Sequence, residues 1–331
     1  MNNRTENGHK SPKSENISSR KNAENFDSDI NQNLIVICGP TAVGKTKNSI
    51  DIAKYFQTEI ISADARQIFD EINIGTAKPS FVELSEIKHH FIGTISIEDT
   101  YNAGIYEQQG LAVIEQLFTQ KNYAVVCGGS GLYIKAICEG FDELPQIHET
   151  LRNEISQLYQ EEGITSLQDK LKALDPEYYK QIDIQNPRRL MRGIENCLSS
   201  GKLHSELQKQ KVSERNFKII KIGFEMNRDE LYEKINQRVD EMMASGLLKE
   251  VETLYSKKNL NALQTVGYSE LFEYIDGKYN LDEAISKIKQ HTRNYAKRQM
   301  TWFRKDDEIK WFHPSEVKEA ITYIDSMTHD R

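Results

Sequence analysis

The chain has 331 residues, of which 38% are hydrophobic and 28% are charged, and its formal net charge is −7. This length predicts one large α/β domain that carries an insertion, or two domains, because a single small core does not organise so many residues. No apolar run approaches the ~18 residues that a membrane-spanning helix needs, so we expect no membrane partner. The negative charge means that any nucleic acid must bind a local basic patch.

Residues 1–32 are rich in Asn, Ser, Lys and Glu. This composition predicts a disordered tail. The tail has no apolar stretch typical of a secretory signal, and its acidic residues argue against a mitochondrial transit peptide, so we expect a cytoplasmic protein. The four cysteines, Cys38, Cys127, Cys138 and Cys197, have no metal-binding spacing and indicate free thiols in a reducing compartment.

The apolar run at residues 34–38 leads into the most informative motif, which fits the phosphate-binding pattern G-x-x-x-x-G-K-[ST]. Its glycines allow the backbone N–H groups to point inward, and the helix expected after it adds positive potential. We expect the lysine to contact the outer phosphates and the last threonine to hold Mg²⁺. The alternative is a glycine turn that matches the pattern by chance. The motif consists of Gly39, Pro40, Thr41, Ala42, Val43, Gly44, Lys45 and Thr46.

The next segments predict a parallel sheet. Apolar residues at helical spacing indicate a helix over 46–56, and residues 59–62 read as a short buried strand. Asp64 follows this strand, at the sheet edge where ligands bind in open α/β folds. It either faces the same crevice as the phosphate-binding loop or caps a helix that begins at Arg66.

A third strand is predicted at residues 123–127, after a helix over 104–120. In nucleoside triphosphatases such a strand usually ends with an acidic residue that helps to hold Mg²⁺ and water. Here Gly128, Gly129 and Ser130 follow instead. The missing carboxylate argues against ATP hydrolysis and against a small-molecule kinase. The small residues suggest the wall of a substrate channel.

Residues 144–214 lack any strand-like run and predict an all-helical insertion. Arg188, Arg189 and Arg192 cluster on adjacent turns of one of its helices. They form either a binding surface or an ordinary solvated face. A strand over 217–224 then returns the chain to the sheet, so residues 33–143 and 215–331 are predicted to form the two parts of one core.

The last part of the chain is predicted to be largely helical. Arg238 lies beside the apolar stripe of a helix over 228–245, where it is either a surface residue or a phosphate ligand. Residues 287–305 hold seven Lys or Arg, no acid and several aromatic residues. This pattern is typical of a helix that binds a nucleic acid backbone, with a solvated face as the alternative. A short strand at 309–313 and a terminal helix follow.

Six motifs together resemble the tRNA dimethylallyltransferases, also called isopentenyltransferases. They occur in family order, and two of them, Ile-Gly-Thr-Ala-Lys-Pro and Ala-Lys-Arg-Gln-Met-Thr-Trp, are specific. The resemblance implies a P-loop NTPase-like parallel sheet flanked by helices, with an all-helical insertion domain. It also implies transfer of a dimethylallyl group from dimethylallyl diphosphate to N6 of adenosine 37 in tRNAs that read codons beginning with U. The motifs occupy residues 39–46, 61–67, 74–79, 128–133, 186–192 and 296–304.

The resemblance also implies roles for individual residues. Asp64 matches the catalytic base, whereas Lys45, Arg238 and Mg²⁺ at Thr46 would stabilise the departing diphosphate, so ATP is not the expected ligand of this nucleotide-binding loop. We expect a monomer that binds the tRNA anticodon stem-loop. The positions that match tRNA contacts of the family are Asp64, Ala65, Arg66, Gln67, Ser130, Arg152, Arg188, Arg189, Leu190, Met191 and Arg192, and in the basic helix Arg293, Lys297 and Arg298.

Three residues depart from the family pattern. Ala65 replaces a usual Ser, Ser130 replaces a usual Thr, and Phe69 replaces a common Tyr. Serine keeps the hydroxyl of threonine, whereas Ala65 and Phe69 each lose one. Two related alternatives therefore stay open: an enzyme that prenylates free adenine nucleotides, and a tRNA-binding homologue with weakened catalysis. The basic helix and the helical insertion favour tRNA as the substrate, because a free nucleotide needs neither.

Overall fold

A computed structural model describes residues 32–142, 144–208 and 213–329 of the chain. The predicted disordered tail lies outside the described residues except for Gln32. Within the described ranges, no helix is long and apolar enough to cross a membrane.

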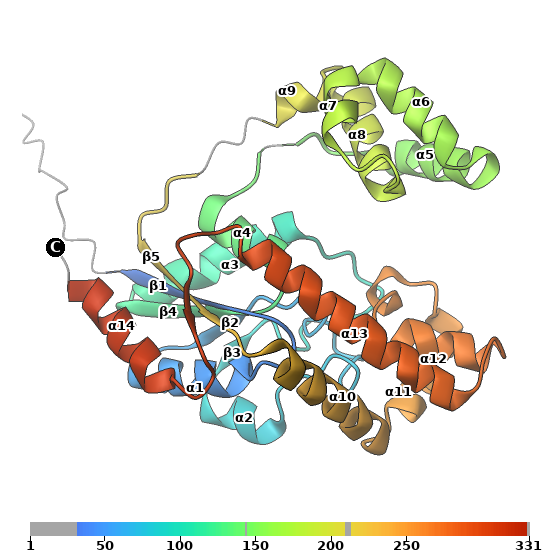
Figure 1. Ribbon diagram of the computed structural model, residues 1–331. Coiled ribbons are helices and arrows are strands. Elements are labelled where there is room, and N and C mark those ends of the chain that lie inside the picture. The colour runs from blue at the N-terminus through green and yellow to red at the C-terminus, as the bar shows by residue number, and fades with distance from the viewer. Residues whose placement is uncertain (1–31, 143, 209–212, 330–331) are drawn as a thin grey trace, which may run out of the picture.

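The core of the molecule is a six-stranded parallel sheet in the order β3-β2-β4-β1-β5-β6 (Figure 1). The central strand β1 is buried along its whole length, which explains the unbroken apolar run at residues 34–38. The predicted strands are confirmed to within a residue or two, but the short edge strand β3 was not predicted from the sequence. The strands are β1 (Asn33–Cys38), β2 (Ile60–Ser62), β3 (His89–His90), β4 (Tyr123–Cys127), β5 (Lys218–Phe224) and β6 (Lys310–Phe312).

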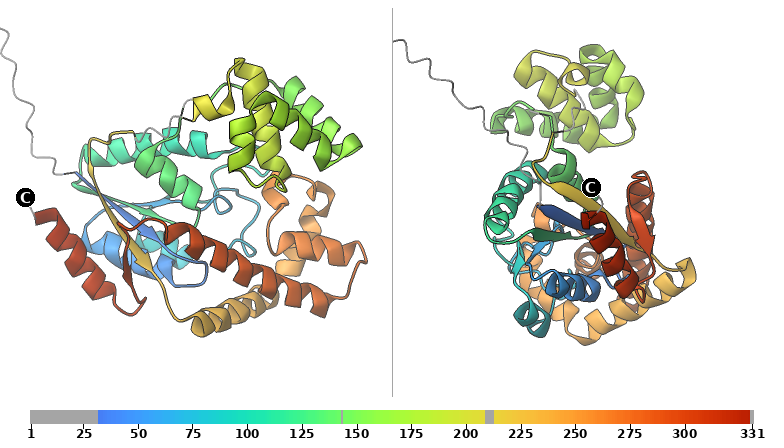
Figure 2. Two further views of the ribbon diagram at one scale, coloured as in Figure 1. Left: turned by 45° about the horizontal axis from the view of Figure 1, so that its top comes forward. Right: turned by 90° about the vertical axis from the view of Figure 1, so that its left-hand side faces the viewer.

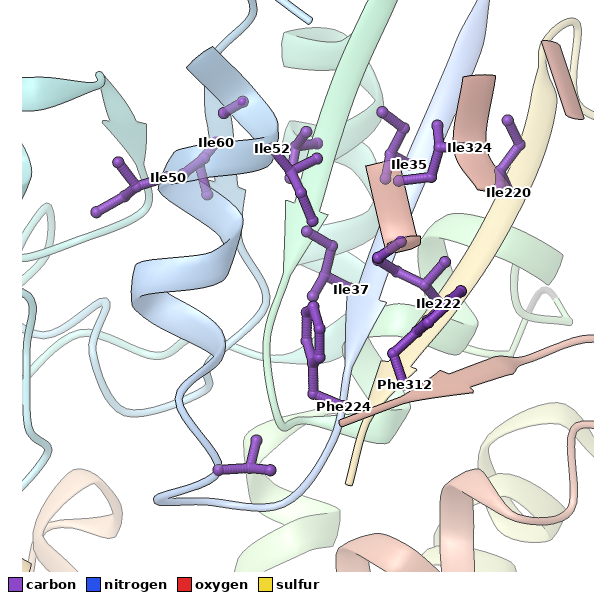
Figure 3. Close-up of a cluster of buried hydrophobic side chains, with 14 of the residues drawn as sticks. Ile35, Ile37, Ile50, Ile52, Ile60, Ile220, Ile222, Phe224, Phe312 and Ile324 are labelled. Atoms are coloured by element: carbon purple, nitrogen blue, oxygen red, sulfur yellow. The ribbon is translucent and has the colours of Figure 1, made fainter. Parts of the chain in front are cut away.

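Helices cover both faces of this sheet (Figure 2). Alternate residues of β1 point to opposite faces. Ile35 and Ile37 pack with Ile52 of α1 (Lys45–Tyr55) and Ile324 of α14 (Val317–His329), as Figure 3 shows. The side chains between them belong to a second cluster with α3 (Ala103–Phe118) and α4 (Gly131–Glu139). The sheet is therefore the middle layer of three.

The predicted insertion is helical and has a hydrophobic cluster of its own, centred on Leu171, Leu190 and Ile194. The helix that carries the arginine cluster begins at Pro187. The Asn186 side chain caps it by accepting from the Arg189 N–H, and proline suits the first helical position. In Figures 1 and 2 this bundle stands apart from the sheet. Its helices are α5 (Glu149–Glu162), α6 (Ile164–Leu174), α7 (Pro176–Gln181), α8 (Pro187–Ser200) and α9 (His204–Leu207).

A third cluster forms where the segment after β2 meets the helices after β5. Phe69 is buried there, in an apolar environment. The helices α2 and α12 of this region were not predicted from the sequence. Those after β5 are α10 (Arg228–Ala244), α11 (Leu247–Leu254), α12 (Tyr268–Ile275) and the long α13 (Leu281–Phe303), and α2 (Phe81–Glu86) precedes β3.

The separate core of the insertion leads to a prediction about its stability. Ile194→Ala removes a fully buried side chain from that core, and we expect it to lower the free energy of unfolding by about 2–5 kcal/mol. Leu198→Ala is the matched control on the same helix, because the Leu198 side chain is 43% exposed, and we expect a change of about 0.5 kcal/mol or less. Urea unfolding followed by circular dichroism measures both, and equal losses would contradict a separate core.

Candidate active site

The carboxyl ends of β1, β2 and β4 open into one cavity of about 920 Å³. This is the edge of a parallel sheet at which ligands bind. The loop after β1 lines the cavity, together with Asp64 after β2 and Gly128 after β4. Two helices complete the wall, α10 with Arg238 and α13 with Tyr295 and Gln299. Residues predicted from separate motifs are therefore neighbours in space.

The phosphate-binding loop curls through two glycines with positive φ, Gly39 at 140° and Gly44 at 99°. A Cβ atom at Gly39 would lie 2.4 Å from the carbonyl oxygen of Phe224, so the loop can pass β5 only with glycine there. Lys45 Nζ donates to the carbonyl oxygens of Gly39 at 2.9 Å and Pro40 at 2.6 Å. Within the described chain, the N–H groups of residues 42–46 have no hydrogen-bond partner. They are available to an anion.

Two cations, Lys45 and Arg238, line the cavity beside this loop, where Asp64 and Glu241 also lie. Burial lowers the pKa of Lys45 and also that of Arg238, and the nearby Asp64 carboxylate acts in the opposite direction on both. In the part of the chain that the structure describes, neither side chain forms an ion pair, and Arg238 donates no hydrogen bond. A partly buried cation is stable when an anion neutralises it. The cavity therefore favours a negatively charged ligand at the loop.

Asp64 lines the cavity, as predicted, and its carboxylate also stabilises a backbone turn. Its Oδ1 accepts from the backbone N–H groups of Arg66 at 2.9 Å and Gln67 at 3.2 Å. The segment forms a hydrogen-bonded turn, so the predicted helix starting at Arg66 is wrong. Its Oδ2 has no partner among the described residues. The turn fixes the carboxylate while one oxygen remains available to accept a proton.

The small residues after β4 pack closely against the Asp64 segment. A Cβ atom at Gly128 would lie 2.1 Å from the Ala63 carbonyl oxygen. Ser130 N donates to that same oxygen at 3.1 Å, and Ser130 Oγ accepts from the N–H of Ala65 at 2.9 Å. The serine hydroxyl thus holds the backbone of Ala65, whose own side chain is not needed for this bond.

Another wall of the cavity is formed by residues 74–79 and depends on a residue that sequence reasoning missed. Glu250 of α11 accepts three successive backbone N–H groups, those of Asn73 at 3.1 Å, Ile74 at 2.9 Å and Gly75 at 3.1 Å. Gln67 Nε2 donates to two carbonyl oxygens of the same segment, at 3.1 and 3.0 Å. Glu250 lies on an ordinary amphipathic helix, and no sequence pattern indicates this role.

Gln299 of α13 is the second residue that was missed. Its Oε1 accepts from the Thr41 N–H at 2.8 Å and its Nε2 donates to the Gly129 carbonyl oxygen at 2.9 Å. Only 6% of this residue is exposed. Two sequence signals could have identified it: its place in the specific motif at residues 296–304, and its spacing of four residues from Tyr295, which puts both on the inner side of the helix.

The predicted arginine cluster of α8 is exposed, with Arg188, Arg189 and Arg192 at the surface. Arg188 is near enough to Arg66 to affect it: burial lowers the pKa of Arg66, and the Arg188 charge lowers it further. Arg152 and Arg192 both lie near Glu195. The arginines of two helices of the insertion therefore gather on one region.

Two neighbouring residues of α8, Leu190 and Met191, pack against the core of the insertion. The Leu190 side chain is fully buried in the core of the insertion, so a contact of this side chain with RNA is wrong. Its apolar chemistry and its position among the helices explain the burial. Met191 is partly buried against the same core.

The basic side chains of α13 divide between two environments. Arg293 faces α10, where its Nη1 donates to Asn236 Oδ1 at 2.6 Å and its guanidinium lies 5.8 Å from the centre of the Tyr232 ring. Lys297 and Arg298 are exposed and line a shallow hollow of about 390 Å³ together with Trp302. The exposed basic surface is therefore narrower than the sequence suggested.

Comparison with known proteins identifies relatives along most of the chain. The family model described as IPP transferase matches residues 67–306. The tRNA dimethylallyltransferase of Christiangramia forsetii is 52% identical over 294 residues, which cover 88% of this chain and 97% of that protein. The tRNA dimethylallyltransferase 1 of Bacteroides fragilis is 47% identical over 291 residues, with coverage of 88% and 97%.

Solved structures agree with the sequence relatives. The tRNA isopentenylpyrophosphate transferase of Bacillus halodurans is 32% identical and superimposes with a TM-score of 0.68, covering 90% of this chain and 97% of that one. A eukaryotic dimethylallyltransferase acting on tRNA, 23% identical, shares the fold with a TM-score of 0.72 over 89% of this chain and 77% of that one. The predicted P-loop NTPase-like fold is confirmed, and the chain belongs to the IPP transferase family.

Proposed function

We propose that this protein transfers a dimethylallyl group from dimethylallyl diphosphate to N6 of adenosine 37 in tRNAs that read codons beginning with U. One observation carries the proposal. A single cavity contains a phosphate-binding loop with two unpaired cations and, facing the same space, a carboxylate with an available oxygen. The names of the bacterial relatives support the same reaction.

The chemistry needs both parts of this cavity. The bond between the allylic carbon and the diphosphate oxygen breaks, and the electron pair leaves with the diphosphate. Lys45, Arg238 and the N–H groups of residues 42–46 stabilise the negative charge that develops there. The adenine N6 forms the new bond to carbon, and Asp64 takes the proton that N6 loses. No phosphoryl group is transferred, so an acidic residue after β4 is unnecessary.

Mg²⁺ fits the same loop. The Thr46 hydroxyl lines the cavity and has no partner among the described residues. The described residues contain no cluster of three or more His, Cys, Asp or Glu that could hold a metal. Mg²⁺ commonly takes one or two protein ligands and completes its coordination with phosphate oxygens and water. Bound at Thr46, the ion would add positive charge beside the leaving diphosphate.

The tRNA anticodon stem-loop is the proposed acceptor. The adenine must leave its stack to reach the cavity, and RNA-binding proteins commonly recognise such splayed bases together with backbone shape. The exposed arginines of the insertion and the exposed basic residues of α13 supply charge for the phosphates, which a free nucleotide would not need. The proposed contacts are Asp64, Ala65, Arg66, Gln67, Ser130, Arg152, Arg188, Arg189, Met191, Arg192, Arg293, Lys297 and Arg298. A monomeric state and a cytoplasmic location stay predictions.

The direct test supplies the protein with Mg²⁺, dimethylallyl diphosphate and an anticodon stem-loop containing A36-A37-A38. We expect N6-dimethylallyl adenosine, detected by mass spectrometry of the digested nucleosides. A stem-loop with G37 is the matched control and gives no product, because it lacks the adenine amine. Product from free AMP but none from the A37 stem-loop would contradict the proposal in favour of a free-nucleotide prenyltransferase.

Asp64→Asn separates catalysis from recognition. Asparagine keeps an oxygen for the Arg66 and Gln67 N–H groups, so the turn is preserved, but it accepts no proton from N6. We expect turnover to fall by about 10²–10⁴-fold. The affinity for the stem-loop, measured by fluorescence anisotropy, should change less than about threefold, which corresponds to ~0.7 kcal/mol. A large loss of affinity with unchanged turnover would make Asp64 a recognition residue.

A further inference from the structure

We propose that Gln299 is a positioning residue that fixes the distance between the diphosphate-binding loop and the segment carrying Asp64. Its Oε1 accepts from the Thr41 N–H in the loop, and its Nε2 donates to the Gly129 carbonyl oxygen after β4, so these two partners belong to the two halves of the cavity. This inference rests on the proposed function, because it concerns the alignment of the two reactants.

Further hydrogen bonds connect the residue after Gly129 to the segment that carries Asp64. The next residue, Ser130, accepts from the Ala65 N–H through its hydroxyl and donates its own N–H to the Ala63 carbonyl. Asp64 lies between those two residues. A continuous series of hydrogen bonds and peptide units therefore joins the Thr41 N–H to the backbone on both sides of the carboxylate.

The surroundings of Gln299 leave its amide little freedom. The residue is 6% exposed, and a Cβ atom at Gly129 would lie 2.3 Å from Gln299 Nε2, so only glycine permits this approach. Both polar ends are hydrogen-bonded in a buried place, where a lost partner costs more than at the surface. The Gln299 amide therefore keeps the Thr41 N–H and the Gly129 carbonyl oxygen at a constant separation.

Gln299 also links the cavity to the outer surface of α13. Tyr295 lies one helical turn before it and lines the cavity, whereas Lys297, Arg298 and Trp302 line the outer hollow. RNA bound to this outer surface would contact the same helix, α13, whose Gln299 is hydrogen-bonded to the diphosphate-binding loop. A shift of α13 would then change the loop and the Asp64 segment together, so they keep their relative position.

The Thr41 bond has a second consequence for the loop. Pro40 has no N–H group, and the Thr41 N–H is taken by Gln299. Anion binding is thus left to the N–H groups that begin at Ala42, close to Lys45 and Thr46. Gln299 directs the diphosphate to the helix end of the loop.

The test compares three variants. Gln299→Leu removes both hydrogen bonds at similar volume. Gln299→Glu keeps an acceptor for Thr41 but cannot donate to Gly129. Gln116→Leu makes the same chemical change on the exposed surface of α3 and is the matched control. Each full-length protein is assayed for kcat and for the KM of dimethylallyl diphosphate and of the A37 stem-loop. Each is also titrated calorimetrically with inorganic diphosphate in the presence of Mg²⁺, which gives the number of diphosphate-binding sites per chain and so the folded fraction.

We expect kcat to fall by about 10–100-fold in both Gln299 variants, because a misplacement of about 1 Å between reacting groups has effects of this size. The KM for the stem-loop should stay within about twofold of the wild type, which corresponds to about 0.4 kcal/mol, and the number of diphosphate sites per chain should equal that of the wild type. Gln116→Leu should match the wild type. Adding Ser130→Ala to Gln299→Leu should lower kcat by less than the product of the two single effects, as expected for one coupled unit.

Two results would overturn the inference. One is a Gln299→Leu protein whose kcat equals that of the wild type. The other is a fall of kcat that parallels the loss of diphosphate sites in both variants, which would mean that Gln299 only supports folding. A wild-type protein that forms no product contradicts the proposed function itself, and this inference with it.

Discussion

The arrangement depends on two partly buried cations beside the phosphate-binding loop. Lys45 and Arg238 face one cavity, burial lowers the pKa of each, and neither forms an ion pair within the described residues. Proteins seldom keep buried cations without an anion, because desolvation is costly. The cost is offset here when an anion binds at the loop. A diphosphate that leaves during the reaction suits such a site better than a permanent carboxylate partner.

The parallel sheet brings the chemistry together. Because β1, β2 and β4 are adjacent and run in the same direction, their carboxyl ends place the phosphate-binding loop, Asp64 and Gly128 around one space. Glycines then allow contacts that a side chain would block, as at Gly39 against β5 and Gly128 against Ala63. The helical insertion has its own core and carries exposed arginines, so its requirements for stability and for binding are largely separate.

Periodicity and motifs predicted the sheet, the order of the main helices and, among the residues that line the cavity, the phosphate-binding loop, Asp64 and Arg238. They succeeded because buried parallel strands are continuously apolar and because the loop motif has one geometry. They did not predict Glu250 or Gln299, whose roles come from hydrogen bonds to backbone groups more than 150 residues away. Leu190 lay inside a basic motif, but it and the next residue, Met191, are the apolar pair between the arginines, and Leu190 faces the core. The two-residue strand β3 is too short to show a pattern.

The central claim is that the loop holds a leaving diphosphate while Asp64 faces the acceptor amine across the same cavity. A crystal structure of the protein with inorganic diphosphate and Mg²⁺ tests it most directly. The account predicts diphosphate oxygens on the N–H groups of residues 42–46, in contact with Lys45 and Arg238, with the metal on the Thr46 hydroxyl and Asp64 Oδ2 left open. Diphosphate bound away from the loop, or a metal ion coordinated by Asp64, would contradict the account.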